Sequence, residues 1–140
     1  MGWTFYNSSG QQLRNTGTVL ATQAEMEAAS SIAAFVTPGR TQYHPGVAKA
    51  WCQIASAGTL VSGDYGVASI TDVGTGERTI VFDTDFSSTN FVALGKPNGL
   101  LNDADEFNID STAVGSASAV HYVSGSLTDR ADFAAFFGDQ

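Results

Sequence analysis

The sequence predicts a mainly β protein, an antiparallel, jelly-roll-like β-sandwich with a short N-terminal helix. Fifteen glycines and only two methionines favour turns and strands over helix packing. Short apolar segments broken by Gly, Asn and Asp follow one another at the spacing of sandwich strands. Because 140 residues suit one main core, we expect residues 1–45 to form an N-terminal hairpin, a capped helix and a connector, and residues 46–140 to form the β-domain.

The polar segment Trp3–Val19 is predicted to contain a small hairpin. It carries two turn signals, Asn7–Gly10 and Asn15–Gly17. Phe5 and Leu13 alternate with polar residues around the first of them. Asn, Ser and Gly supply the backbone freedom that a tight turn needs.

The one helix that the sequence indicates spans Leu20–Phe35. Thr22 and Glu25 have the spacing of a capping box, in which each side chain accepts a hydrogen bond from the other residue's backbone N–H. Pro38-Gly39 is expected to end this segment. The helix also has a narrow face of small residues at helical spacing, which would allow close approach of a neighbouring helix. These residues are Ala24, Ala28 and Ala29.

The β-domain is expected to begin with a strand at Val47–Ile54, in which Ala50, Cys52 and Ile54 share the apolar face. The clearest hairpin signal is Asp72–Gly76, because glycine at a hairpin tip tolerates positive φ. Its strands would be Tyr65–Thr71 and Glu77–Thr84. Further strands are predicted at Asn90–Gly95, Phe107–Asp110, Ala117–Ser124 and Asp132–Phe137, with a connector at Ser124–Ala131.

The last predicted strand holds Phe133, Phe136 and Phe137, more aromatic rings than one strand face requires. They suggest that both faces of the strand are buried, against another sheet or another chain. A charged fraction of only 14% also favours partial burial of the surface against partner chains. Strand edges would need protection, and trimer formation is one way to provide it.

The net charge of −8 disfavours nucleic acid and anionic membranes as partners. No apolar run approaches the roughly 20 residues of a membrane span. The single cysteine, Cys52, excludes an intrachain disulfide and a site of several thiolates. Gly74-x-Gly76 lacks the lysine and helix start of a nucleotide loop. We therefore expect no cofactor and no membrane insertion.

Residues with possible metal or catalytic chemistry each have a simpler structural interpretation, which we favour. His44 could bind a metal on a three-fold axis. Asp103 and Asp105 could bind Ca²⁺, but the EF-hand pattern is absent, and a solvated acidic loop at 102–106 explains these carboxylates. Asp83 and Asp85 could act as a glycosidase pair, although no groove is predicted beside them. His121 is expected to be a packed or surface strand histidine, and Cys52 a buried, inert thiol. No catalytic residue is assigned.

Aromatic residues are the best candidates for a contact surface, since aromatic rings stack on sugars and anchor protein interfaces. Trp51 lies on the less apolar face of its strand with Lys49 and Gln53, and burial in a subunit interface or under a loop is the favoured interpretation. Loops 98–106 and 124–129 are candidates for host contact, because binding residues concentrate in loops. The receptor or interface candidates are Tyr43, Trp51, Tyr65, Asn98, Asn102, Asp103 and Tyr122.

Several segments together resemble bacteriophage tail-fibre and tail-collar proteins. The first two, around the predicted helix, resemble their "AT-x-AE-x-x-A … VTP" element, and the others resemble the start and central hairpin of a C-terminal tail-protein domain. The resemblance covers roughly residues 3–82, and the remainder matches loosely. The segments are Ala21–Ser30, Phe35–Arg40, Gln42–Trp51, Ala68–Gly76 and Thr79–Phe82.

This resemblance implies a non-enzymatic virion protein, made in the host cytoplasm and carried on a tail or surface fibre. It implies a homotrimer that contacts other virion proteins and a host receptor, for which a glycan is one candidate. Three alternatives remain: a carbohydrate-binding module of a secreted enzyme, a purely structural virion connector or decoration protein, and a polysaccharide depolymerase tip. Oligomeric state, glycan binding and release of reducing sugar would separate them.

Overall fold

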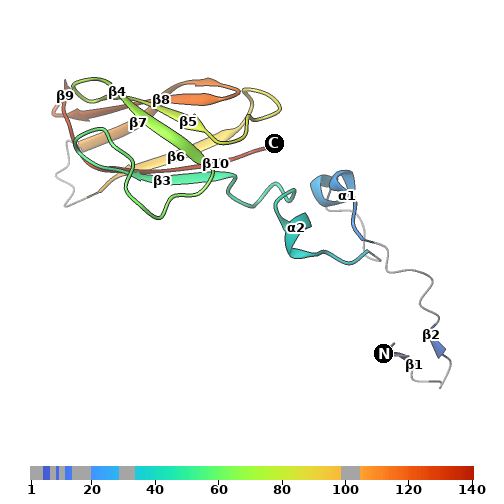
Figure 1. Cartoon of the computed structure of the whole chain (residues 1–140). Coiled ribbons are helices and arrows are strands. Elements are labelled where there is room, and N and C mark those ends of the chain that lie inside the picture. The colour runs from blue at the N-terminus through green and yellow to red at the C-terminus, as the bar shows by residue number, and fades with distance from the viewer. Residues whose placement is uncertain (1–4, 7–8, 10–11, 14–19, 29–33, 99–104) are drawn as a thin grey trace. The chain divides into compact units, whose positions relative to one another are not determined.

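The structure of the protein is a computed structural model that describes residues 5–6, 9, 12–13, 20–28, 34–98 and 105–140. It divides into two compact units, Met1–His44 and Pro45–Gln140 (Figure 1). The second unit contains two antiparallel sheets and the first contains the short helices, so the prediction of a mainly β, sandwich-like fold is confirmed at this level.

The first unit contains the predicted hairpin and the predicted cap. Strands β1 (Phe5–Tyr6) and β2 (Gln12–Leu13) pair antiparallel. Helix α1 (Gln23–Ala28) follows the capping box, in which the Glu25 backbone N–H donates to Thr22 Oγ1 at 3.2 Å and the Thr22 N–H donates to the Glu25 carboxylate at 2.8 Å. These two bonds satisfy backbone donors that the start of a helix would otherwise leave free.

The predicted helix range of 20–35 was too long. Leu20 and Phe35 lie in a parallel bridge instead, with the Ala21 N–H donating to the Phe35 carbonyl at 3.0 Å. Pro38-Gly39 was expected to end the helical segment, but Pro38 begins a second helix, α2 (Pro38–Thr41). Proline suits the first turn of a helix because no N–H is needed there.

The second unit consists of a smaller and a larger sheet. Strands β3 (Ala50–Ile54), β10 (Asp132–Phe137) and β6 (Val92–Pro97) form the three-stranded sheet, with β10 in the centre. Strands β4 (Val67–Gly74), β5 (Glu77–Phe82), β8 (Ser116–Val123) and β7 (Asp105–Ala113) form the five-stranded sheet in that order, and β9 (Ser126–Leu127) pairs with β8.

Strict alternation of buried and half-buried residues places the core between the two sheets. In β10, Asp132, Ala134 and Phe136 are buried and the residues between them are not. The predicted apolar face of β3 is confirmed, because Ala50, Cys52 and Ile54 are all buried. The larger sheet contributes Val67, Ile80, Phe82, Phe107, Ala117 and Ala119 to the same core.

The structure corrects several predicted strand boundaries. Strand β3 begins at Ala50 rather than Val47, and β7 extends from Asp105 to Ala113. The supposed connector 124–131 contains the short strand β9. The central hairpin is confirmed, with a tighter turn than predicted: β4 continues to Gly74, and Gly76 has the expected positive φ, of 71°.

Arg78 connects the loops at one end of the sandwich. Its side chain is 2% exposed and its guanidinium donates to the carbonyls of Gly74, Glu77 and Ser56 and to Asp129 Oδ1 at 3.0 Å. The Gly76 N–H also donates to Asp129, and this bond, together with Arg78, lowers the pKa of the Asp129 carboxyl. A charge this deeply buried is tolerated only when so many acceptors surround it.

Gly95 allows the smaller sheet to approach β7, and its replacement by alanine is expected to destabilise the fold. A Cβ at this position would overlap the ring of Phe107, which is itself 9% exposed in the core. Such overpacking typically costs about 1–3 kcal/mol of unfolding free energy, measurable by urea denaturation. Gly74→Ala is the matched control, because its Cβ would meet only the Glu77 carboxylate at 3.4 Å. Equal stability of the two variants would contradict this account.

Candidate functional site

The most distinctive surface of the second unit is the side of the three-stranded sheet that points away from the core. We call it the outer face. It consists of the outward residues of three neighbouring strands, and Tyr65 extends it because its backbone exchanges two hydrogen bonds with Trp51, at 2.8 and 3.0 Å. Trp51 is 45% exposed, Tyr65 50% and Leu94 58%. The outer face contains Trp51, Gln53, Tyr65, Val92, Leu94, Lys96, Phe133, Ala135 and Phe137.

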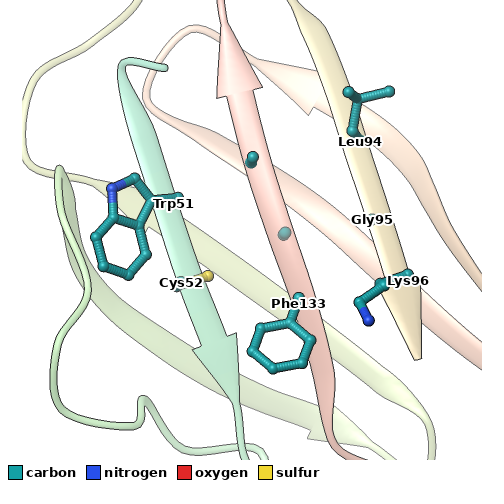
Figure 2. Close-up of a pocket in the computed structure, with 8 residues that line it drawn as sticks. Trp51, Cys52, Leu94, Gly95, Lys96 and Phe133 are labelled. Carbon is teal, nitrogen blue, oxygen red and sulfur yellow. The ribbon is translucent and has the colours of Figure 1, made fainter. Parts of the chain in front are cut away.

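An open groove of about 440 Å³ runs across this face (Figure 2). Its origin lies in the strand register, because Ala135 on the central strand is paired with Trp51 on one side and Leu94 on the other. A methyl group between two large side chains leaves a hollow. Phe133, two residues away on the same face, closes one end. The groove is therefore a direct consequence of one small residue in the middle of the sheet.

The groove is almost wholly apolar, and its one charged lining residue is Lys96. The Lys96 ammonium lies 5.3 Å from the centre of the Phe133 ring, a cation–π geometry that Figure 2 shows as a nitrogen directed towards the ring. No carboxylate belongs to the outer face as defined. Asp64, which precedes Tyr65 in the chain, is close enough for its charge to act on Cys52 in the groove, and Asp132, which precedes Phe133, is buried.

The opposite outer surface, on the five-stranded sheet, has a different chemistry. Residues with hydroxyl side chains pair with one another in one row across its strands. In a neighbouring row, Val120 pairs with Glu77 on one side and with Asn108 on the other. A solvated sheet face is expected to be polar in this way. The hydroxyl row is Thr71, Thr79, Ser118 and Ser111.

The structure brings together two of the predicted contact residues and separates the others. Trp51 and Tyr65 are neighbours on the outer face. Tyr43 lies in the first unit, where the Arg40 guanidinium stands 5.9 Å from its ring centre. Tyr122 is half-buried on the five-stranded sheet, opposite Glu106 and Leu127. Asn98 is exposed and its N–H donates to the Ala131 carbonyl, whereas Asn102 and Asp103 lie outside the described residues.

The metal candidates do not form a cluster in the part of the chain that the structure describes. No group of three or more His, Cys, Asp or Glu side chains there could hold a metal ion. His44 is exposed in the first unit. Asp105 was predicted to lie in a solvated loop, but it begins β7 and one of its oxygens is buried without a hydrogen bond. Asp103 lies outside the described residues.

His121 and Asp132 form a buried polar pair between the sheets. The His121 Nδ1 and the Asp132 Oδ1 are 2.7 Å apart and each side chain is 2% exposed. The packed position predicted for His121 is thus confirmed. Burial raises the pKa of the Asp132 carboxyl, against the opposing effects of the His121 hydrogen bond and of the charges on His121 and Arg78. Because it is enclosed, this pair has no access to a substrate.

Cys52 is confirmed as a buried thiol, and burial raises its pKa to about 12. Sequence reasoning missed most of the groove, namely Leu94, Lys96 and Ala135. The alternation of residues within β6 and β10 could have placed them on one side of their strands. It could not show that β10 lies between β3 and β6, because those pairings join distant parts of the chain.

Comparisons with known proteins do not identify this surface. No protein family, no curated protein and no solved structure matches the chain. Within the described residues, no helix has the length and apolar character to cross a membrane.

Proposed function

We propose that this chain is a non-enzymatic structural and adhesion module of a bacteriophage tail fibre or related virion fibre. In this proposal it is displayed as a homotrimer with a jelly-roll-like β-domain. The observation that carries it is the outer face, an exposed apolar surface on a chain with few charges. Exposed contiguous apolar surface on a soluble protein marks an interaction site.

The described chemistry supports binding over catalysis. The groove is lined by aromatic, aliphatic and backbone groups, and its one ionisable side chain facing solvent is Lys96. The histidine and carboxylate that lie 2.7 Å apart in the second unit, His121 and Asp132, are sealed in the core. Hydrolysis of a sugar or ester would need a positioned acid, base or nucleophile at an accessible surface.

The virion assignment comes from the sequence resemblance in residues 21–51 and 68–82. In a fibre, three copies would present their contact surfaces together, so that weak individual contacts with a host receptor add up to avidity. Host contact is then expected in the loops and in the segment 124–129, which contains the short strand β9. The partners are other copies of the chain, other virion proteins and a receptor on the host cell.

Immunogold electron microscopy tests the proposal. Antibodies raised against the purified chain should label fibres on virus particles from the bacterium that carries the gene. Binding of the purified chain to host cells, competed by those particles, would separate an adhesion role from a purely structural one. Label on cellular or secreted material with none on particles would contradict the virion assignment.

A further inference from the structure

We propose that the outer face of the three-stranded sheet is the surface through which copies of this chain associate, with Trp51 and Leu94 as its anchors. This inference rests on the trimeric state in the proposed function and assigns that state to particular residues. Its occupant is a second copy of the chain.

The chemistry of the groove favours a protein surface over a small polar ligand. Leu94 and Val92 are each 58% exposed, and branched aliphatic side chains gain stability by burial against other apolar side chains. A sugar would need several hydrogen-bonding groups to orient it. The outer face offers few such side chains, namely Lys96, Gln53 and the hydroxyl of Tyr65. Aromatic anchors beside aliphatic residues are instead typical of the core of a protein interface.

The charge distribution favours this sheet face over the other as the contact between copies. Each chain carries a net charge of −8, so two copies repel one another across most of their surface. The outer face contains no carboxylate, and its one charge is the Lys96 ammonium. Of the two sheet faces of the second unit, it is therefore the one on which an acidic neighbour meets less repulsion. The polar five-stranded sheet, with Glu77 and Glu106 on its outward side, offers no such surface.

The groove also has the shape for a side chain from a neighbour. Ala135 forms its floor between Trp51 and Leu94, and an opening of about 440 Å³ accepts a large apolar group. Each copy exposes large apolar side chains on this same face. When the faces of several copies turn towards a common axis, the side chains of one copy can fill the groove of the next. Burial of Trp51 against a neighbour would remove it from water.

Charge and truncation variants at the anchors test the interface. Leu94→Lys and Trp51→Gln alter exposed side chains, so the fold should be retained, which near-native circular dichroism would verify. Each is expected to raise the concentration at which copies associate by about 30-fold or more, as for an interface hot spot. Light scattering across a concentration series gives this value. Val73→Lys, at a residue 61% exposed on β4, is the matched control and should leave association unchanged.

The outcomes separate the two proposals. If the wild type associates and both anchor variants associate equally well, the assignment of the interface is overturned while the trimeric fibre remains. If the wild type stays a single chain at every concentration, both the interface and the trimeric state in the proposed function are overturned. If the wild type is a single chain, fluorescence of the Trp3→Phe variant tests the alternative occupant. Quenching of Trp51 by a saccharide would assign the face to a carbohydrate instead.

Discussion

Replacement of Asp132 by alanine is expected to lower the free energy of unfolding by about 3–5 kcal/mol, the usual cost of removing one member of a buried pair. Asp132 is 1% exposed as a residue, and its Oδ1 lies 2.7 Å from His121 Nδ1. Without it, that nitrogen would lie in the core with nothing to bond to, while His121 Nε2 already has no hydrogen-bond partner in the structure. Urea denaturation at neutral pH measures the loss.

Two further variants locate the cause of this effect. Asp132→Asn retains an oxygen that can accept a hydrogen bond from His121 and should lose less stability than Asp132→Ala. Replacing both His121 and Asp132 by leucine should cost less than the sum of the single replacements, because neither polar group is then left without its partner. A loss below about 1 kcal/mol for Asp132→Ala would show that the pair contributes little.

The pH dependence of Asp132 has a defined sign. Burial raises the pKa of this carboxyl, so the folded state binds its proton more tightly than the unfolded chain does. The stability contributed by this proton is fully present below the ordinary value of about 3.9, and it is lost as the pH rises through the folded pKa. The wild type should therefore lose stability relative to Asp132→Asn as the pH rises from about 4.

Asp129 supplies an internal comparison of opposite sign. The Gly76 N–H and Arg78 lower the pKa of this carboxyl. Its contribution to stability is present above the ordinary aspartate pKa and is lost as the pH falls through the folded value. Asp129→Asn should thus differ from the wild type more at neutral than at acidic pH. Slopes of the same sign for the two asparagine variants would contradict the assignment of these pKa directions.

Phe136→Ala is expected to destabilise the β-domain by about 3–5 kcal/mol, the usual cost of deleting a fully buried aromatic ring. Phe136 is 0% exposed, and its ring centre lies 4.9 Å from that of Phe82 and 6.1 Å from that of Phe91, both in edge-on geometry. Thermal or urea unfolding at a fixed chain concentration measures the change, since association would add to apparent stability.

Phe133→Ala is the matched control on the same strand. Its side chain is half-buried on the outer face, so its removal should cost less stability than that of Phe136 while weakening association. If the two variants were equally destabilised as single chains, the division of β10 into a core face and an outer face would be wrong.

The residue pattern was sufficient to predict the layers but not how the strands are paired. Alternation in 50–54 correctly separated buried Ala50, Cys52 and Ile54 from exposed Trp51. Of the predicted burial of both faces of β10, the single chain shows one face: Phe136 is in the core, while Phe133 and Phe137 are half-buried, and their burial against another chain stays a prediction. Period-two alternation tells which residues share a face, but it does not tell what covers that face.

Long-range pairings account for the other differences. The helix prediction ran through Phe35 because local propensity cannot register the bridge from Leu20 to Phe35, which takes both residues out of the helix. His121 and Asp132 are on strands of different sheets, so their contact leaves no local motif. The groove depends on Ala135 lying between Trp51 and Leu94, which requires the register of two strand pairs.

Sedimentation equilibrium of the wild-type chain over a micromolar concentration range tests the central claim most directly. The proposed trimer predicts a species of three times the mass of one chain. If the outer face is its interface, Trp51 fluorescence in a Trp3→Phe background shifts to shorter wavelength as copies assemble. A folded species with the mass of one chain throughout this range, and with Trp51 still in contact with water, would contradict it.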